Sequence, residues 1–225
     1  GTVLCHPKLE QPIRDLMEAW VEIEAQRTPY RVIAMDPAGD SVEHEIKNNY
    51  YLRAFDTVHT SPSLGYVIVE RRSKLKDDYV GLPQEKLVEL KKQGEEITRI
   101  VEVPWIAYMG DTSPGDHFLR DDVRQAKILI TECTFSANDH RERARIGKHI
   151  HLDDLVKIMD QLENEAIVLN HLSRRTHLGH ARQQLDRLVP AEHRDRVFIL
   201  MDNRTNRQRY QDQVAEAERK QAARD

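Results

Sequence analysis

Three apolar, strand-like runs in this 225-residue sequence end beside a side chain that can do chemistry. The three side chains at these exits are those of Asp111, Glu132 and His171. Strand ends that open into polar loops are common places for catalytic groups, because the strand positions the group and the loop exposes it. The pattern predicts a site assembled from separate loops. His171 is its most informative member, because a serine and two arginines follow it at positions 173–175.

The residue types at these exits favour metal chemistry. Imidazole and carboxylate groups are ligands that a divalent metal such as zinc prefers, and a metal-bound water becomes a nucleophile near neutral pH. Each residue alone also has a simpler interpretation. A histidine near a strand end often only makes hydrogen bonds, and Asp111 can cap a turn. His149 and His151 fit two ligands on one strand face or, equally, the start of a helix whose first turn is acidic.

The elements that must position these residues alternate between strands and helices, which is typical of an α/β protein. Apolar residues spaced by three and four predict an amphipathic helix over residues 7–26. Polar residues 71–78 predict a loop. Further helices are predicted over 83–94, 152–162 and 181–188, and strands over 30–35, 50–58, 66–70, 103–109, 127–132, 166–170 and 196–202. One domain is expected over 1–205, followed by a polar, helical tail over 206–225.

Composition excludes several classes of protein. Hydrophobic residues make up 39% of the chain, which is enough for a real core. The net charge of −4 with 32% charged residues argues against a protein that coats nucleic acid through bulk charge. Cys5 and Cys133 stand too far apart for a disulfide framework, so a reducing cytoplasm is expected. No apolar run approaches the roughly 20 residues that span a bilayer, so no membrane partner is expected.

Five motifs occur in a fixed order along the chain: HTSPSLGY at 59–66, YMGDT at 108–112, TECTF at 131–135, HIHLD at 149–153 and NHLSRR at 170–175. Together they resemble the ribonuclease Z branch of the metallo-β-lactamase superfamily. Members of that branch are zinc-dependent endonucleases that trim the 3′ trailers of precursor tRNAs. The opening VLCHPKLEQPIR at 3–14 is similar to the strand and helix that follow the family's first histidine motif. The resemblance implies a four-layer αββα sandwich.

The resemblance also implies a role for each matching residue. His59, Asp111 and His171 match metal ligands, with Asp111 bridging two zinc ions. Glu132 matches the glutamate of the family's His-Glu-Ala-Thr motif, and His151, with His149 as the alternative, matches the loop histidine that pairs with it. That pair is thought to donate a proton to the leaving oxygen. Ser173 and Arg175 match groups that meet the phosphate, for which a guanidinium fork is well suited.

The chain departs from the family pattern at two places. The signature His-x-His-x-Asp-His motif does not occur in the 225 residues, so the N-terminal part of the fold is expected to be absent from this chain. Residues 74–96 stand where the family carries an arm with a Gly-Pro motif that grips tRNA, and this motif is missing. The substrate therefore stays open between precursor tRNA and a small ester or phosphodiester.

The function expected from these motifs is hydrolysis of a phosphodiester by a zinc-activated hydroxide, most simply as a ribonuclease Z-type endoribonuclease. A metallo-hydrolase of small esters or phosphodiesters is a second hypothesis. A metal-free scaffold or interaction module is a third, supported by the missing signature motif. The resemblance further implies a homodimer.

Overall fold

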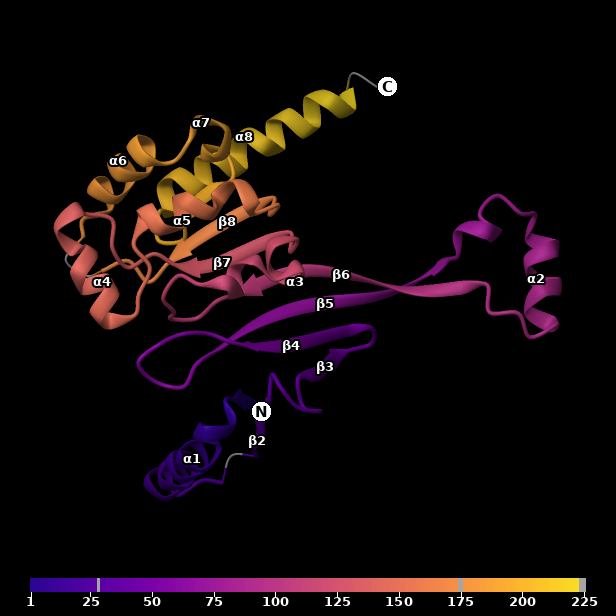
Figure 1. Cartoon of the computed structure of the whole chain (residues 1–225), viewed down its shortest axis with the longest axis horizontal. Helices are drawn as coiled ribbons and strands as arrows, with labels where there is room; N and C mark the ends of the chain where they lie inside the picture. The colour runs from indigo at the N-terminus through magenta and orange to yellow at the C-terminus, as the bar shows by residue number, and fades with distance from the viewer. Residues whose placement is uncertain (28, 174–175, 223–225) are drawn as a thin grey trace.

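The computed structural model describes residues 1–27, 29–173 and 176–222. Its centre is a seven-stranded sheet in the order β3-β4-β5-β6-β7-β8-β9, accompanied by a two-stranded parallel sheet, β1-β2 (Figure 1). In the large sheet β3 to β6 are antiparallel neighbours, whereas β6 to β9 run parallel. The strands are β1 Thr2–Cys5, β2 Arg31–Ala34, β3 Glu43–Lys47, β4 Tyr50–Asp56, β5 Leu64–Leu75, β6 Thr98–Tyr108, β7 Ile128–Glu132, β8 Ala166–Asn170 and β9 Val197–Ile199.

Helices cover one face of the large sheet. Alternating strand residues such as Val67, Leu129 and Ile167 are fully buried against helix residues such as Val123 and Leu155, and together they form the main core. This alternation is what a strand with one buried face requires. The α-helices of the chain are α1 Glu10–Glu24, α2 Gln84–Lys92, α3 Asp121–Arg124, α4 Arg141–Gly147, α5 Leu152–Ile158, α6 Leu178–Leu188, α7 Ala191–Arg194 and α8 Asn203–Ala222.

The two-stranded sheet packs on the opposite face. Leu4 and Ile33 of this sheet pack against a second cluster that includes Ala54 and Leu64 of β4 and β5. Helix α1 lies beyond β2, and its Arg14 donates a hydrogen bond to the Val32 carbonyl (Figure 1). The order helices, sheet, sheet, helix confirms the predicted αββα sandwich. The predicted absence of an N-terminal part stays a prediction.

One predicted loop is wrong. Residues 71–78 were expected to form a loop, yet β5 continues to Leu75 and pairs with β6 from Arg71–Glu102 to Leu75–Thr98. Here the two strands leave the body of the sheet as a ribbon that carries α2 at its far end (Figure 1). We call residues 71–102 the arm. Both faces of this ribbon lie outside the core, so its strands lack the apolar alternation that marks the rest of β5.

The predicted helices and the final strand are confirmed, with small differences in their bounds. Helix α8 begins three residues before the expected tail, and its first turns are joined to β9, since Asn206 and Arg209 donate hydrogen bonds to the carbonyls of Ile199 and Val197. The division into a domain and a tail stays a prediction. Among the described residues, no helix combines the length and apolar character needed to cross a bilayer.

Candidate metal and catalytic site

The three strand exits meet at one edge of the sheet. Strands β6, β7 and β8 are parallel neighbours, so their carboxyl ends, and the loops that follow them, lie side by side. Gly110 makes the turn after β6 at φ +62°, where an added Cβ would lie 3.3 Å from the Leu64 carbonyl oxygen. His171 follows β8 at φ +52°, an unusual conformation for a residue other than glycine. Both turns direct the chain toward the shared edge.

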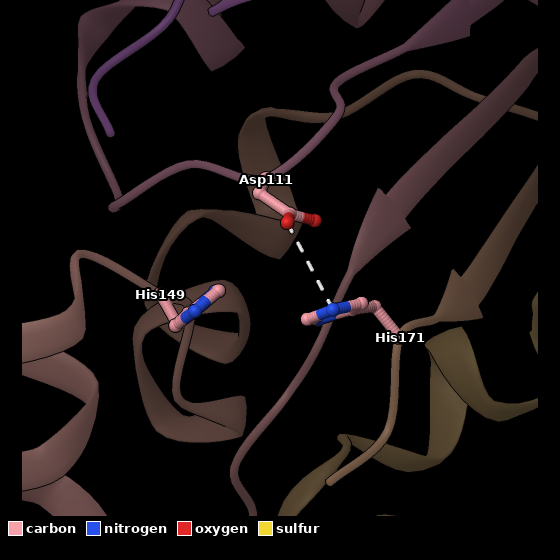
Figure 2. Close-up of side chains that lie close together, drawn as sticks. All are labelled: Asp111, His149 and His171. Atoms are coloured by element: carbon pink, nitrogen blue, oxygen red, sulfur yellow. Dashed lines mark ion pairs between the residues drawn. The ribbon is translucent and has the colours of Figure 1, made fainter. Parts of the chain in front are cut away.

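Asp111 and His171 face one another across this edge. His171 Nε2 lies 3.8 Å from Asp111 Oδ2, and both side chains are about half exposed (Figure 2). His149, from the loop after α4, joins them, and one ligand-type atom from each of the three residues lies within 4.8 Å of the other two. Figure 2 shows the three side chains pointing into the same space. The Asp111 carboxylate and the His171 imidazole are groups that suit zinc and similar cations, and the His149 imidazole lies close enough to act on a group bound beside them.

Glu132 is the buried partner of His149. His149 Nδ1 donates to Glu132 Oε1 at 2.7 Å, and Glu132 is only 1% exposed. The same carboxylate accepts backbone N–H groups of Thr112 at 2.9 Å and Ile150 at 3.2 Å, and the Thr134 hydroxyl at 2.6 Å. Donors surround a group that, when ionised, can only accept. The site is therefore built to hold a carboxylate that fixes the imidazole of His149.

The expectation that His151 is the partner of Glu132 is wrong. His151 Nε2 donates to the Ala137 carbonyl at 3.0 Å, and its Nδ1 accepts the Asp153 N–H at 3.2 Å. Its ring caps the N-terminus of α5, with burial lowering its pKa. Both ring nitrogens are thus used in the neutral form. The segment 149–151 enters α5 with His149 turned to the site and His151 turned to the core.

His59 lies at the margin of the site. Its ring is 5.0 Å from the His149 ring, and its Nδ1 donates to the Lys148 carbonyl at 3.1 Å. Lys148 Nζ in turn donates to the His59 carbonyl, and Lys148 has φ +53°. His59 is not among the side chains that the structure brings within ligand distance of Asp111 and His171. Its role as a metal ligand stays a prediction.

Ser173 and Arg175 were predicted to meet the phosphate, and Ser173 lies on the loop after β8. The Ser173 N–H donates to the Thr134 carbonyl at 3.0 Å, which ties this loop to the one that follows β7. Arg175 lies outside the described residues. A cavity of about 420 Å³ is lined in part by His149, Arg141 and Lys148.

Sequence reasoning missed Thr134, Lys148 and His117. Thr112 Oγ1 accepts the Val58 N–H and lies 3.0 Å from His117 Nε2, so His117 supports the turn that carries Asp111. Thr134 stands inside the TECTF motif, but its role, like those of Lys148 and His117, depends on contacts with distant segments.

Fold and site together define a protein of the metallo-β-lactamase fold. Among solved structures, the metallo-β-lactamase fold protein YhfI from Bacillus subtilis is similar with a TM-score of 0.51 and 15% identity, over 88% of this chain and 59% of that one. No protein-family model matches the chain.

Curated proteins named tRNase Z are similar to this chain. The chain is 29% identical to tRNase Z TRZ1 of Arabidopsis thaliana over 204 residues, which cover 88% of this chain and 71% of the relative. It is 30% identical to the chloroplastic tRNase Z TRZ2 of the same plant over 192 residues, covering 81% of this chain and 51% of the relative. The chain is therefore similar, over most of its length, to two proteins named tRNase Z. It spans about half to seven tenths of the length of these two relatives.

Proposed function

We propose that the protein is a metal-dependent phosphodiesterase of ribonuclease Z type that cleaves RNA, with precursor tRNA as the substrate. The observation that carries the proposal is that two pairs of side chains, Glu132–His149 and Asp111–His171, lie together at one edge of the sheet. The Glu132–His149 pair can move a proton, and the Asp111–His171 pair can hold a cation. Relatives named tRNase Z and ribonuclease Z support the reaction class.

Asp111 and His171 would hold the metal. Their carboxylate and imidazole atoms match the preferences of zinc, and we propose zinc as the metal, with two ions in the complete site. We propose His59 as a further ligand from this chain, since its ring centroid lies 5.0 Å from that of His149. A bound divalent cation would supply Lewis acidity and lower the pKa of a water molecule toward neutrality.

His149 is the proton donor in this proposal. Because its Nδ1 is committed to Glu132, only Nε2 is left to face the substrate. The buried carboxylate orients the ring, and a protonated His149 can donate its Nε2 proton to the leaving oxygen as the phosphodiester bond breaks. Ser173 and Arg175 are proposed to contact the phosphate.

The arm favours a macromolecular substrate. Helix α2 lies at the far end of a two-stranded ribbon, well away from the strand exits (Figure 1). A small ester would gain nothing from a surface at that distance, whereas a folded RNA could contact both places. This observation favours RNA over the small-substrate hypothesis, even though the Gly-Pro motif of the family's arm is missing.

The test compares two substrates with and without metal. The protein is stripped with a chelator, reloaded with zinc, and assayed on a precursor tRNA and on bis(p-nitrophenyl) phosphate. Zinc-dependent cleavage of the precursor tRNA is the expected result. Equally slow hydrolysis by stripped and reloaded protein would contradict the metal mechanism. Restored activity on the small diester alone would favour the second hypothesis, and failure to hold any metal would favour a scaffold.

A further inference from the structure

Thr134 lies between the Glu132–His149 pair and the Asp111–His171 pair. Its hydroxyl Oγ1 lies 2.6 Å from Glu132 Oε2 and 2.8 Å from His171 Nδ1. The residue is 7% exposed, so water does not compete freely for these contacts. A continuous chain of hydrogen bonds therefore runs from His149 through Glu132 and Thr134 to His171.

The number of protons available decides which atom donates in each of these hydrogen bonds. A threonine hydroxyl has one hydrogen to donate and lone pairs that accept, whereas a carboxylate can only accept. Glu132 Oε2 also receives the N–H groups of Ile150 and, at 3.4 Å, of Thr134 itself, as a carboxylate would. The hydroxyl hydrogen of Thr134 must therefore point to Glu132. The contact with His171 then requires that Nδ1 of this ring carries a proton and donates it to the hydroxyl oxygen.

We propose that Thr134 is a positioning residue that holds His171 in the tautomer protonated at Nδ1. In this tautomer the lone pair is on Nε2, which is the atom that lies 3.8 Å from Asp111 Oδ2. A neutral imidazole binds a cation only through its unprotonated nitrogen, and a partner on the other nitrogen fixes which one that is. The importance of the tautomer for metal binding rests on the proposed function, but the tautomer itself does not.

The main chain of Thr134 reinforces this role. Its carbonyl accepts the Ser173 N–H at 3.0 Å, so the residue holds both the ring of His171 and the loop two residues beyond it. His171 adopts φ +52°, a conformation that is unfavourable for a residue other than glycine. Contacts on both sides of the turn maintain it. One buried carboxylate, Glu132, thus orients His149 through Oε1 and His171 through Oε2 and Thr134.

The first test reads the tautomer in the metal-free chain. Nitrogen-15 NMR at about pH 8.5, some two units above the ordinary histidine pKa, separates protonated from unprotonated ring nitrogens of His171. Wild type and Thr134→Ser are expected to show a protonated Nδ1 and an unprotonated Nε2. Thr134→Val, which keeps the shape and removes the hydroxyl, is expected to show a mixture of tautomers. A wild-type ring protonated at Nε2, or an unchanged single tautomer in Thr134→Val, would overturn the inference.

Thr131→Val is the matched control. Thr131 is also fully buried next to Glu132, but its hydroxyl donates to the Glu132 main-chain carbonyl and does not contact His171. The same loss of a buried hydroxyl should therefore leave the His171 tautomer unchanged. If Thr131→Val disturbs the tautomer as much as Thr134→Val, the effect is general loosening of the core and the inference is wrong.

The second test measures zinc affinity by competition with a chromophoric chelator. Thr134→Val is expected to bind zinc about 10–100-fold more weakly, as is usual when a residue that orients a ligand is lost. Thr134→Ser should bind as wild type does. If none of the proteins, wild type included, binds zinc, the proposed function fails, while the NMR result still decides the role of Thr134.

Discussion

His149 Nδ1 lies 2.7 Å from Glu132 Oε1, although the two residues are 17 positions apart in the chain. His151, two residues further on, turns away from the site and caps α5 instead. A buried carboxylate that fixes one imidazole nitrogen leaves the other free for chemistry. His149 therefore belongs to the candidate site, whereas His151 stabilises the fold.

The two histidines should therefore respond differently to the same change. His149→Gln is expected to lower the turnover rate by roughly 10²–10⁴-fold, the usual contribution of a general acid, with little change in stability. His151→Gln should lower the free energy of unfolding by about 1–3 kcal/mol, because the Ala137 carbonyl and the Asp153 N–H lose the ring as their hydrogen-bond partner. Rate assays and urea unfolding measure the two effects. A large rate loss in folded His151→Gln beside an active His149→Gln would reverse the assignment.

Metal binding should depend on the facing pair. Asp111→Ala and His171→Ala are each expected to abolish tight zinc binding, because each removes one of few ligands. His180→Ala, at an exposed position in α6, is the control and should bind zinc as wild type does. Metal analysis after gel filtration provides the measurement. Full zinc content in both Asp111→Ala and His171→Ala would place the metal elsewhere.

The arm should matter for RNA alone. The Lys76 N–H donates to the Ile97 carbonyl at 2.9 Å and closes the ribbon just before α2. Replacing residues 77–96 with a two-residue Asn-Gly turn, which suits a hairpin, removes α2 and leaves the sheet intact. We expect the KM for precursor tRNA to rise while hydrolysis of bis(p-nitrophenyl) phosphate stays unchanged. Equal loss on both substrates would show that the arm supports the site itself.

Gly65 is required by close packing within the sheet. A Cβ at this position would lie 2.2 Å from the Phe55 ring, which is itself 1% exposed. Gly65→Ala should cost about 1–3 kcal/mol of stability, as overpacking does. Gly179→Ala in α6 meets nothing within 4 Å and should instead gain about 0.4–1 kcal/mol. Denaturant unfolding of both variants tests the contrast, and equal stabilities would contradict it.

Acid should destabilise the fold through His117. Burial lowers the pKa of this ring below its ordinary value, so the unfolded chain takes up its proton first as the pH falls. Stability is therefore complete above the unfolded pKa of about 6.5 and declines below it, until the folded pKa is reached. His117→Gln should show a shallower loss of stability between pH 7 and pH 5. An unchanged slope in urea unfolding at several pH values would contradict this prediction.

The sequence alone determined the α/β class, the strand exits that carry Asp111, Glu132 and His171, and the family that their order resembles. These features can be recognised from the sequence, because hydrophobic periodicity depends on neighbouring residues and motif order depends only on position along the chain. The resemblance placed an arm at residues 74–96, but the sequence did not reveal that two extended strands carry it, because a ribbon outside the core has no buried face to leave a periodic pattern.

Only the tertiary structure decided which histidine pairs with Glu132 and what joins that pair to His171. His149 and His151 are equivalent by residue type and both follow the same helix, α4. The difference arises where the chain enters α5, since one ring must cap that helix and the other then points to the sheet edge. The link through Thr134 depends on three loops meeting at the ends of parallel strands. Such contacts between distant segments leave no signal in a single sequence.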